Sequence, residues 1–190
     1  MPILPAEPEM YPDNLWDEAL TPAATVRRWY CLHTRPRQEK ATARDLRSAE
    51  IAFYLPQIVR EDRTPGGRKI RSVLPLFGGY LFLFGDESHR TRALMGNRLV
   101  GVLDVTDQVA LALDLQQIHL MLRSGLAIVP EARAPLGSRI RIVTGPLAGL
   151  VGTVVRRGKR DQFIAVVRML GSGVAVDLAD WQVEVLDRPE

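Results

Sequence analysis

One strand constrains this chain more than any other feature, because its residues are apolar on both sides. Alternation along residues 79–84 (GYLFLF) puts Tyr80, Phe82 and Phe84 on one face and two leucines on the other. Residues 29–33 (WYCLH) behave likewise. A half-solvated sheet alternates apolar and polar residues, so a sheet built on these strands needs cover on both faces. Amphipathic helices can cover one face. The other takes a third helix, the N-terminal residues or another protein, unless the aromatic residues simply belong to the core.

The pattern around these strands predicts an α+β domain, a sandwich with a mostly antiparallel sheet. The expected order of elements is β-α-β-β-β-α-β-α. Helices are expected after Thr34 and over residues 88–95 and 107–124, and Thr64-Pro65-Gly66-Gly67 predicts a hairpin turn. The expected strands cover residues 29–33, 52–59, 69–74, 79–84 and 99–103.

The sequence pattern changes beyond residue 126. Five short runs rich in Val and Ile, separated by glycine-containing turns, predict a small closed β-barrel. We therefore expect a flexible acidic leader over residues 1–26, the α+β domain over 27–126, a linker over 127–135 and the barrel over 136–188.

Charge is distributed unevenly along the chain. Residues 1–26 hold five acidic side chains and no Lys or Arg, whereas residues 27–71 hold twelve basic against five acidic side chains. Clustered bases of this kind suggest a nucleic-acid partner.

Several classes of protein are excluded by what the sequence lacks. The single cysteine, Cys31, rules out a disulfide framework within the chain and a cysteine-based metal site. The three histidines have no ligand-type spacing, and we find no catalytic constellation, so we expect no enzyme, no metal and no cofactor. The longest uncharged apolar stretch, residues 73–85, is shorter than the ~20 residues of a membrane span. The sequence predicts a soluble, cytoplasmic monomer.

Three stretches resemble the N-terminal domain of NusG-type transcription factors. They are Trp29-Tyr30, residues 33–40 (HTRPRQEK) and residues 75–82 (PLFGGYLF). Residues 137–154 (GSRIRIVTGPLAGLVGTV) are similar to the KOW motif that follows in the same family. The resemblance covers residues 27–188 and implies an N-terminal domain of the NusG type followed by an SH3-like KOW barrel.

The resemblance implies a transcription elongation or antitermination factor that binds RNA polymerase and reduces pausing or termination. In the family, the hydrophobic side of the N-terminal sheet docks on the clamp helices of the largest subunit. Carried over by motif, the polymerase-binding positions are His33, Phe77, Tyr80 and Phe82. Gly78 stands where the family usually has a proline.

Residues 33–36 (HTRP) are closer to the specialised paralogues similar to RfaH, which act on particular operons, some by reading non-template DNA. That resemblance implies nucleic-acid contacts for Arg35 and Arg98. Arg37, Lys40 and Arg44 on the first helix extend a basic surface toward the phosphates, unless they form only a solvated helix face.

The KOW domain contains one further candidate site. Met169, Leu170 and Gly171 correspond to the loop through which NusG contacts termination factor Rho or a ribosomal small-subunit protein. β-Branched residues in the preceding strands favour a constitutive barrel over a helical alternative. Two other functions stay open: a housekeeping factor that recruits Rho or the ribosome, and a ribosome-associated protein that binds RNA through the barrel.

Overall fold

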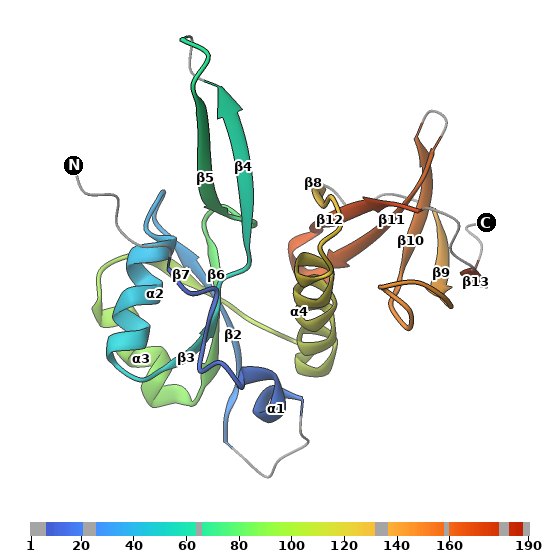
Figure 1. The fold of residues 1–190 in the computed structure, drawn as a ribbon. Coiled ribbons are helices and arrows are strands. Elements are labelled where there is room, and N and C mark those ends of the chain that lie inside the picture. The colour runs from blue at the N-terminus through green and yellow to red at the C-terminus, as the bar shows by residue number, and fades with distance from the viewer. Residues whose placement is uncertain are drawn as a thin grey trace. The chain divides into compact units, whose positions relative to one another are not determined.

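The computed structural model describes residues 7–20, 26–63, 66–131, 137–157, 160–178 and 183–187 (Figure 1). The chain divides into two compact units, Met1–Gln108 (unit 1) and Val109–Glu190 (unit 2). The elements of unit 1 are β1 (Met10–Tyr11), α1 (Leu15–Ala19), β2 (Arg28–Thr34), α2 (Glu39–Ser48), β3 (Ala52–Tyr54), β4 (Gln57–Arg63), β5 (Lys69–Pro75), β6 (Tyr80–Gly85), α3 (Glu87–Met95) and β7 (Leu99–Leu103).

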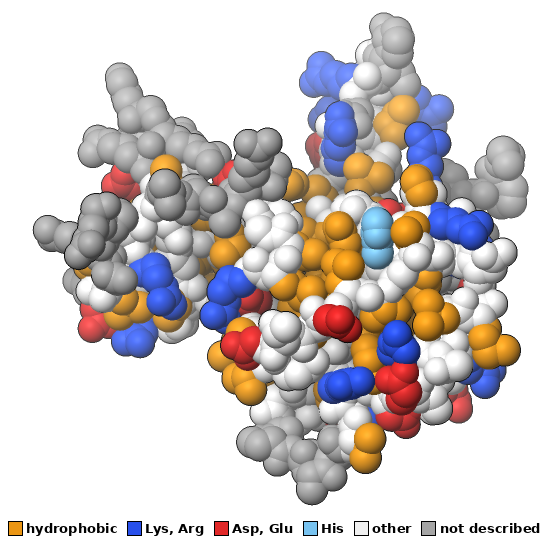
Figure 2. All heavy atoms as spheres, turned by 180° about the vertical axis from the view of Figure 1, so that it is seen from behind, with side chains coloured by type: hydrophobic (Ala, Val, Ile, Leu, Met, Phe, Trp, Pro, Cys, Tyr) orange, Lys and Arg blue, Asp and Glu red, His pale blue; other side chains and the backbone are white. Residues whose placement is uncertain are grey.

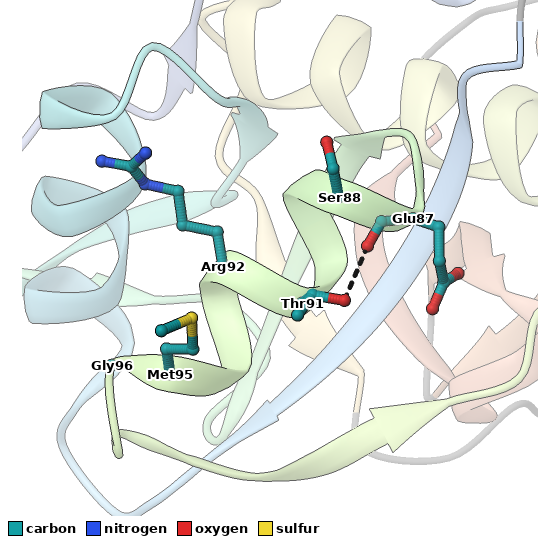
Figure 3. A pocket seen from close by; sticks show the side chains of 6 residues that line it. All are labelled: Glu87, Ser88, Thr91, Arg92, Met95 and Gly96. Atoms are coloured by element: carbon teal, nitrogen blue, oxygen red, sulfur yellow. Dashed lines mark hydrogen bonds between the residues drawn. The ribbon is translucent and has the colours of Figure 1, made fainter.

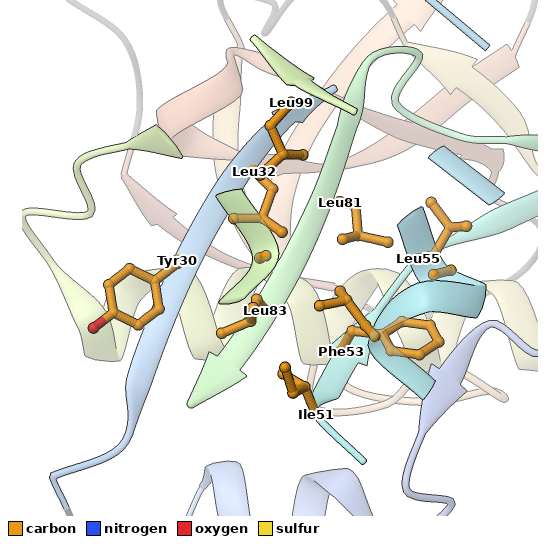
Figure 4. Packing of buried hydrophobic residues seen from close by; sticks show 11 residues of the cluster. Tyr30, Leu32, Ile51, Phe53, Leu55, Leu81, Leu83 and Leu99 are labelled. Atoms are coloured by element: carbon orange, nitrogen blue, oxygen red, sulfur yellow. The ribbon is translucent and has the colours of Figure 1, made fainter. Parts of the chain in front are cut away.

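Unit 1 is built on a five-stranded antiparallel sheet in the order β1-β3-β6-β2-β7, which confirms the predicted α+β class. Helices α2 and α3 supply the apolar residues Ala43, Leu46 and Ala93 to a core on one face of this sheet. The strands contribute the larger side chains, including Leu32 and Leu81 from the two central strands (Figure 4). This face is therefore an ordinary hydrophobic core, covered by the unit's own helices.

The expected strand over residues 52–59 is two strands in different sheets. β3 belongs to the five-stranded sheet, whereas β4 pairs with β5 in a separate two-stranded hairpin. The change comes at Leu55 and Pro56, where the proline has no N–H for a ladder and its carbonyl accepts a bond from the backbone N–H of Leu76 at 2.8 Å. The hairpin consequently extends away from the sheet (Figure 1).

Residues 7–20, expected to be part of a flexible leader, are instead packed on unit 1. Met10 and Tyr11 of β1 pair with β3, and Leu15 of α1 is fully buried. A two-residue strand and a five-residue helix are too short to leave a hydrophobic period, so the sequence pattern did not reveal them. The remaining leader residues, 1–6 and 21–25, lie outside the described residues.

In the part of unit 2 that the structure describes, six strands form an antiparallel sheet in the order β13-β9-β10-β11-β12-β8. Its strands match the five expected Val- and Ile-rich runs, with one addition. That addition is β8, inside the expected linker, which pairs with β12 through Val129 and Pro130. The bounds are β8 (Val129–Glu131), β9 (Ser138–Ile142), β10 (Val151–Arg157), β11 (Arg160–Val167), the 3-10 turn η1 (Arg168–Leu170), β12 (Ser172–Asp177) and β13 (Val183–Asp187).

Helix α4 (Gln108–Arg123) packs with the six-stranded sheet of unit 2, although the sequence placed it in the N-terminal domain. Asp114, only 5% exposed, accepts hydrogen bonds from the Arg168 backbone N–H at 2.9 Å and from its Nε at 3.1 Å. Gln117 accepts a bond from the Val151 N–H at 2.9 Å. The first residue of α4, Gln108, belongs to unit 1, where its Nε2 donates to the Trp29 carbonyl at 2.9 Å. Helical periodicity predicts a buried stripe but does not say which sheet buries it. None of the helices in the described ranges is both long and apolar enough to cross a membrane.

Candidate functional site

The candidate site lies on the second face of the unit 1 sheet, opposite α2 and α3. The register of β2 on β6 pairs Trp29 with Phe84, Cys31 with Phe82, and His33 with Tyr80. Because directly opposite residues of antiparallel strands share a face, all six side chains lie on this second face. We call it the aromatic face.

The four predicted polymerase-binding residues are brought together at one end of the aromatic face. The rings of His33 and Tyr80 stack with centroids 5.1 Å apart and planes 20° from parallel. Phe77 meets Phe82 edge-on at 6.2 Å. The four side chains thus form two ring pairs. One pair joins β2 to β6, and the other joins the turn before β6 to β6 itself.

The four predicted polymerase-binding residues differ in how far they are exposed. Phe82 is completely buried and Phe77 is 6% exposed, whereas His33 and Tyr80 are each only half-buried. In this arrangement Phe82 supports the surface from within, and the stacked His33–Tyr80 pair is what a partner can reach. Alternation assigns a residue to a face but does not say how deeply that face is covered.

The turn before β6 holds Tyr80 in place. Gly79 adopts a φ of +83°, a left-handed conformation that residues with a Cβ avoid. Its N–H donates to Oε1 of Glu39 at 2.7 Å, and its carbonyl accepts from the Thr34 N–H at 2.8 Å. Glu39 is buried at the start of α2, so the helix, strand β2 and the turn are fixed to one another.

Arg35 and Arg98, the two predicted DNA-contacting residues, also lie together. The Arg35 backbone N–H donates to the Arg98 carbonyl at 2.8 Å, and both side chains line a hollow of about 560 Å³. Arg98 is held by Asp45, at 2.6 Å from Nε, and by Gln38, at 2.8 Å from Nη1. Arg35 is exposed and donates one bond to Asn97 at 2.8 Å. Its other guanidinium N–H groups can reach an anion outside.

The three basic residues predicted on the first helix do not form one open surface. Lys40 donates from Nζ to the Val73 carbonyl at 2.5 Å and so braces the base of the hairpin. Arg44 forms an ion pair with Glu7 at 3.6 Å. Arg37 lies in the turn before α2, exposed, with a φ of +63°. The sequence pattern did not reveal the contacts of Lys40 and Arg44, because their partners come from distant segments of the chain.

The hairpin contains basic residues that the sequence analysis did not single out as a site. Figure 2 shows Lys and Arg side chains along the projecting hairpin and hydrophobic side chains below it. These exposed bases are Arg60, Arg63, Arg68, Lys69 and Arg71. The positive charge of residues 27–71 was the available signal, but only the fold shows that much of it lies on one projecting ribbon.

Two further features are a buried thiol, that of Cys31, and a hollow along α3. Burial raises the pKa of the Cys31 thiol to about 12, so this cysteine is no nucleophile near neutral pH. A hollow along α3 is lined by Glu87 and Arg92, whose side chains point to opposite sides of the helix (Figure 3). The Glu87 carboxylate accepts from Arg90, which lowers its pKa and keeps it charged.

In unit 2 the predicted partner loop follows the anchor between Asp114 and Arg168. Met169 is 37% exposed, Leu170 is half-buried, and Gly171 ends the turn with a φ of +62°. The loop therefore presents one large apolar side chain to solvent, directly after a residue fixed to α4.

A family profile and a related protein that match this chain both carry the name NusG. The sequence profile of the family described as "Transcription termination factor nusG" matches residues 27–121. The transcription termination/antitermination protein NusG of Thermus thermophilus is 28% identical, over 82% of this chain and 96% of its own length. A structure of Thermotoga maritima NusG, titled for its domain interaction, aligns over 85% of this chain and 98% of its own with 16% identity and a TM-score of 0.44. A chain of the MjSpt4:Spt5 complex aligns over 85% and 99% with 14% identity and a TM-score of 0.28.

Proposed function

This chain belongs to the NusG family of transcription termination/antitermination factors, and from that premise we propose that it binds RNA polymerase through the aromatic face of unit 1. The partner in this proposal is the pair of clamp helices of the largest subunit. Docking there restrains opening of the clamp and so reduces pausing or termination. The observation that carries the proposal is the stacked, half-exposed His33–Tyr80 pair on a face that is otherwise aromatic and buried.

The energetics of such a contact are sufficient for a small hot spot. An aromatic side chain buries about 150–250 Å² when fully covered. No more than about a third of Tyr80 is still exposed, and covering it at about 25 cal/mol per Å² contributes roughly 1–2 kcal/mol, whose upper end reaches the range of a hot-spot residue. The stacking of the two rings and the bonds that hold Gly79 keep Tyr80 in place, so little conformational entropy is lost when a partner binds.

The basic edge beside the aromatic face is proposed to contact non-template DNA. Arg35 presents free guanidinium donors next to Arg98, whose own orientation is set by Asp45 and Gln38. A pre-oriented guanidinium suits bidentate contacts to phosphate or to base edges. Arg37, Lys40 and Arg44 belong to the same proposed surface, with Lys40 and Arg44 acting once phosphates compete for them.

We propose a specialised role on particular operons, because the Arg35–Arg98 pair offers a means of reading an exposed strand. The partner loop at Met169, Leu170 and Gly171 is the proposed contact for Rho or a ribosomal small-subunit protein. A housekeeping factor would depend on that loop and not on Arg35. Comparing Arg35→Ala with Met169→Ala in a pausing assay and in a Rho-dependent termination assay separates the two roles.

The direct test of docking is Tyr80→Ala, measured as the affinity of the full chain for an RNA polymerase elongation complex. Loss of about 1–2 kcal/mol weakens binding by roughly 5- to 30-fold. The matched control is Met95→Ala, because Met95 is an 80% exposed apolar side chain of the same unit on α3. Circular dichroism and thermal unfolding establish that both variants stay folded.

Unchanged affinity in a folded Tyr80→Ala variant, with His33→Ala equally silent, would refute docking through the aromatic face. Equal losses in Tyr80→Ala and Met95→Ala would point to a general effect on unit 1 instead of a contact. Co-purification of ribosomal subunits without polymerase would replace the proposal by an RNA-binding role for the barrel.

A further inference from the structure

Residues 7–20 precede the part of the chain that the family profile matches, yet they fold back on unit 1. We call them the strap. β1 extends the sheet beyond β3 by pairing Met10 with Tyr54 and Tyr11 with Phe53. The Leu55 N–H donates to the Glu9 carbonyl at 2.6 Å, and Gln57 Nε2 donates to the Glu7 carbonyl at 3.0 Å. The strap thereby closes one edge of the sheet.

Helix α1 of the strap lies on the aromatic face. The Trp16 ring sits 5.9 Å from Trp29 and 5.1 Å from Tyr54, centroid to centroid. Trp29 is paired across the strands with Phe84, and Tyr54 with Phe82. Trp16 therefore covers two rings of the aromatic face. The half-buried His33–Tyr80 pair lies on the same face, on neighbouring strands. The strap covers one end of the face, and the proposed docking contact occupies the other.

The strap also neutralises basic residues of unit 1. It contains five acidic side chains and no Lys or Arg. Glu7 pairs with Arg44 on α2 at 3.6 Å, and Glu18 pairs with Arg27, whose guanidinium lies 4.8 Å from the centre of the Phe84 ring. One short segment thus covers apolar rings beside the proposed docking contact and neutralises Arg44, one base of the proposed nucleic-acid surface.

The attachments of the strap are few compared with those of the central sheet. β1 contributes two residue pairs, whereas β2 and β6 share six. α1 is five residues long, and among the described residues no side chain caps its start at Asn14. Leu15 is its only fully buried side chain in the described range. Segments with few buried contacts open at low cost while the rest of the fold stays intact.

We propose that the strap is an autoinhibitory element, displaced when the polymerase takes the aromatic face. This inference rests on the proposed function. Displacement adds Trp29 and Tyr54 to the apolar surface available to the partner and frees Arg27 and Arg44 for phosphates. Because linkage is reciprocal, nucleic acid that binds Arg44 in place of Glu7 loosens the strap and favours docking, and docking in turn favours nucleic-acid binding.

The test uses the full chain with Leu15→Ala and Trp16→Ala combined, which loosens the strap and leaves every residue of β2 and β6 unchanged. Two quantities are measured: the affinity for an RNA polymerase elongation complex, and the fluorescence of a hydrophobic dye such as bis-ANS with the protein alone. Asn14→Ala is the matched control, because Asn14 is exposed at the same helix and its side chain makes no capping bond. Glu7→Gln is a second variant that releases only Arg44.

Coupling between sites commonly amounts to about 5- to 150-fold in affinity. We expect the loosened strap to tighten polymerase binding by at least about 5-fold and to raise dye binding, with Asn14→Ala unchanged. Glu7→Gln should tighten binding only when nucleic acid is present. Equal or weaker polymerase binding by the loosened variant overturns the inference while leaving the proposed function standing. If no variant binds polymerase, the proposed function fails, and unchanged dye fluorescence then overturns the strap as well.

Discussion

Two adjacent glycines in the turn before β6 are predicted to respond oppositely to alanine. Gly79 has a φ of +83°, and a Cβ built there would lie 3.7 Å from Cδ2 of His33, an ordinary contact. The cost of Gly79→Ala is therefore backbone strain, about 1–2 kcal/mol for a residue with a Cβ in the left-handed region. Gly78 has no positive φ, and nothing in the described part of the chain lies within 4 Å of its would-be Cβ.

Both substitutions reduce the entropy of the unfolded chain by the same amount, about 0.4–1 kcal/mol. That contribution cancels when the variants are compared with each other, so the difference between them isolates the strain. We expect Gly78→Ala to equal or exceed the parent in stability and Gly79→Ala to be about 1–2 kcal/mol less stable than Gly78→Ala. Urea unfolding followed by tryptophan fluorescence measures this, because Trp16 and Trp29 both report on unit 1.

Finding Gly79→Ala as stable as Gly78→Ala would refute the left-handed turn and with it the placement of Tyr80. The same pair has a functional readout. Strain in Gly79→Ala acts on the turn that Glu39 and Thr34 hold, so Tyr80 loses its alignment with His33 and polymerase affinity falls. Gly78→Ala leaves those bonds in place and should bind as the parent does.

Three further predictions follow from single contacts. Burial raises the pKa of Cys31 from 9.0 to about 12, which lowers the thiolate fraction at pH 8 by about a thousand-fold. A thiol reagent should therefore label the native chain far more slowly than the urea-unfolded chain. Equal rates would contradict the burial. Asp114→Ala removes charged hydrogen bonds to Arg168 and should lower the free energy of unfolding of unit 2 by about 2 kcal/mol, and Asp114→Asn should lower it by about half as much. Chemical denaturation measures both. An unchanged midpoint would show that other contacts hold α4. Arg35→Ala should weaken binding to single-stranded DNA and reduce the slope of log affinity against log salt by about 1, whereas a slope equal to that of the parent would exclude a phosphate contact.

The candidate site was predictable where it depends on strand alternation and on local motifs. Alternation placed Tyr80 and Phe82 on one face of their strand, and the family motif grouped them with His33, whereas the pairing of His33 with Tyr80 comes from the structure. Arg35 and Arg98 met because the ends of β2 and β7 are neighbours in the sheet. The states of Lys40 and Arg44 were not predictable, since their partners, the Val73 carbonyl and Glu7, are more than thirty residues away in the chain.

The pattern of residues was enough to predict that unit 1 has a sheet with two apolar faces, because side chains alternate with a period of two whatever lies above them. It also determined the Val- and Ile-rich strands of unit 2. The folded chain was needed to show that α1 sits on Trp29 and Tyr54, that α4 from Val109 onward belongs to unit 2, and that Phe82 is buried while Tyr80 remains accessible. Periodicity is a local property of the backbone, whereas cover and exposure depend on which distant segment pairs with a face, and short segments leave no period to read.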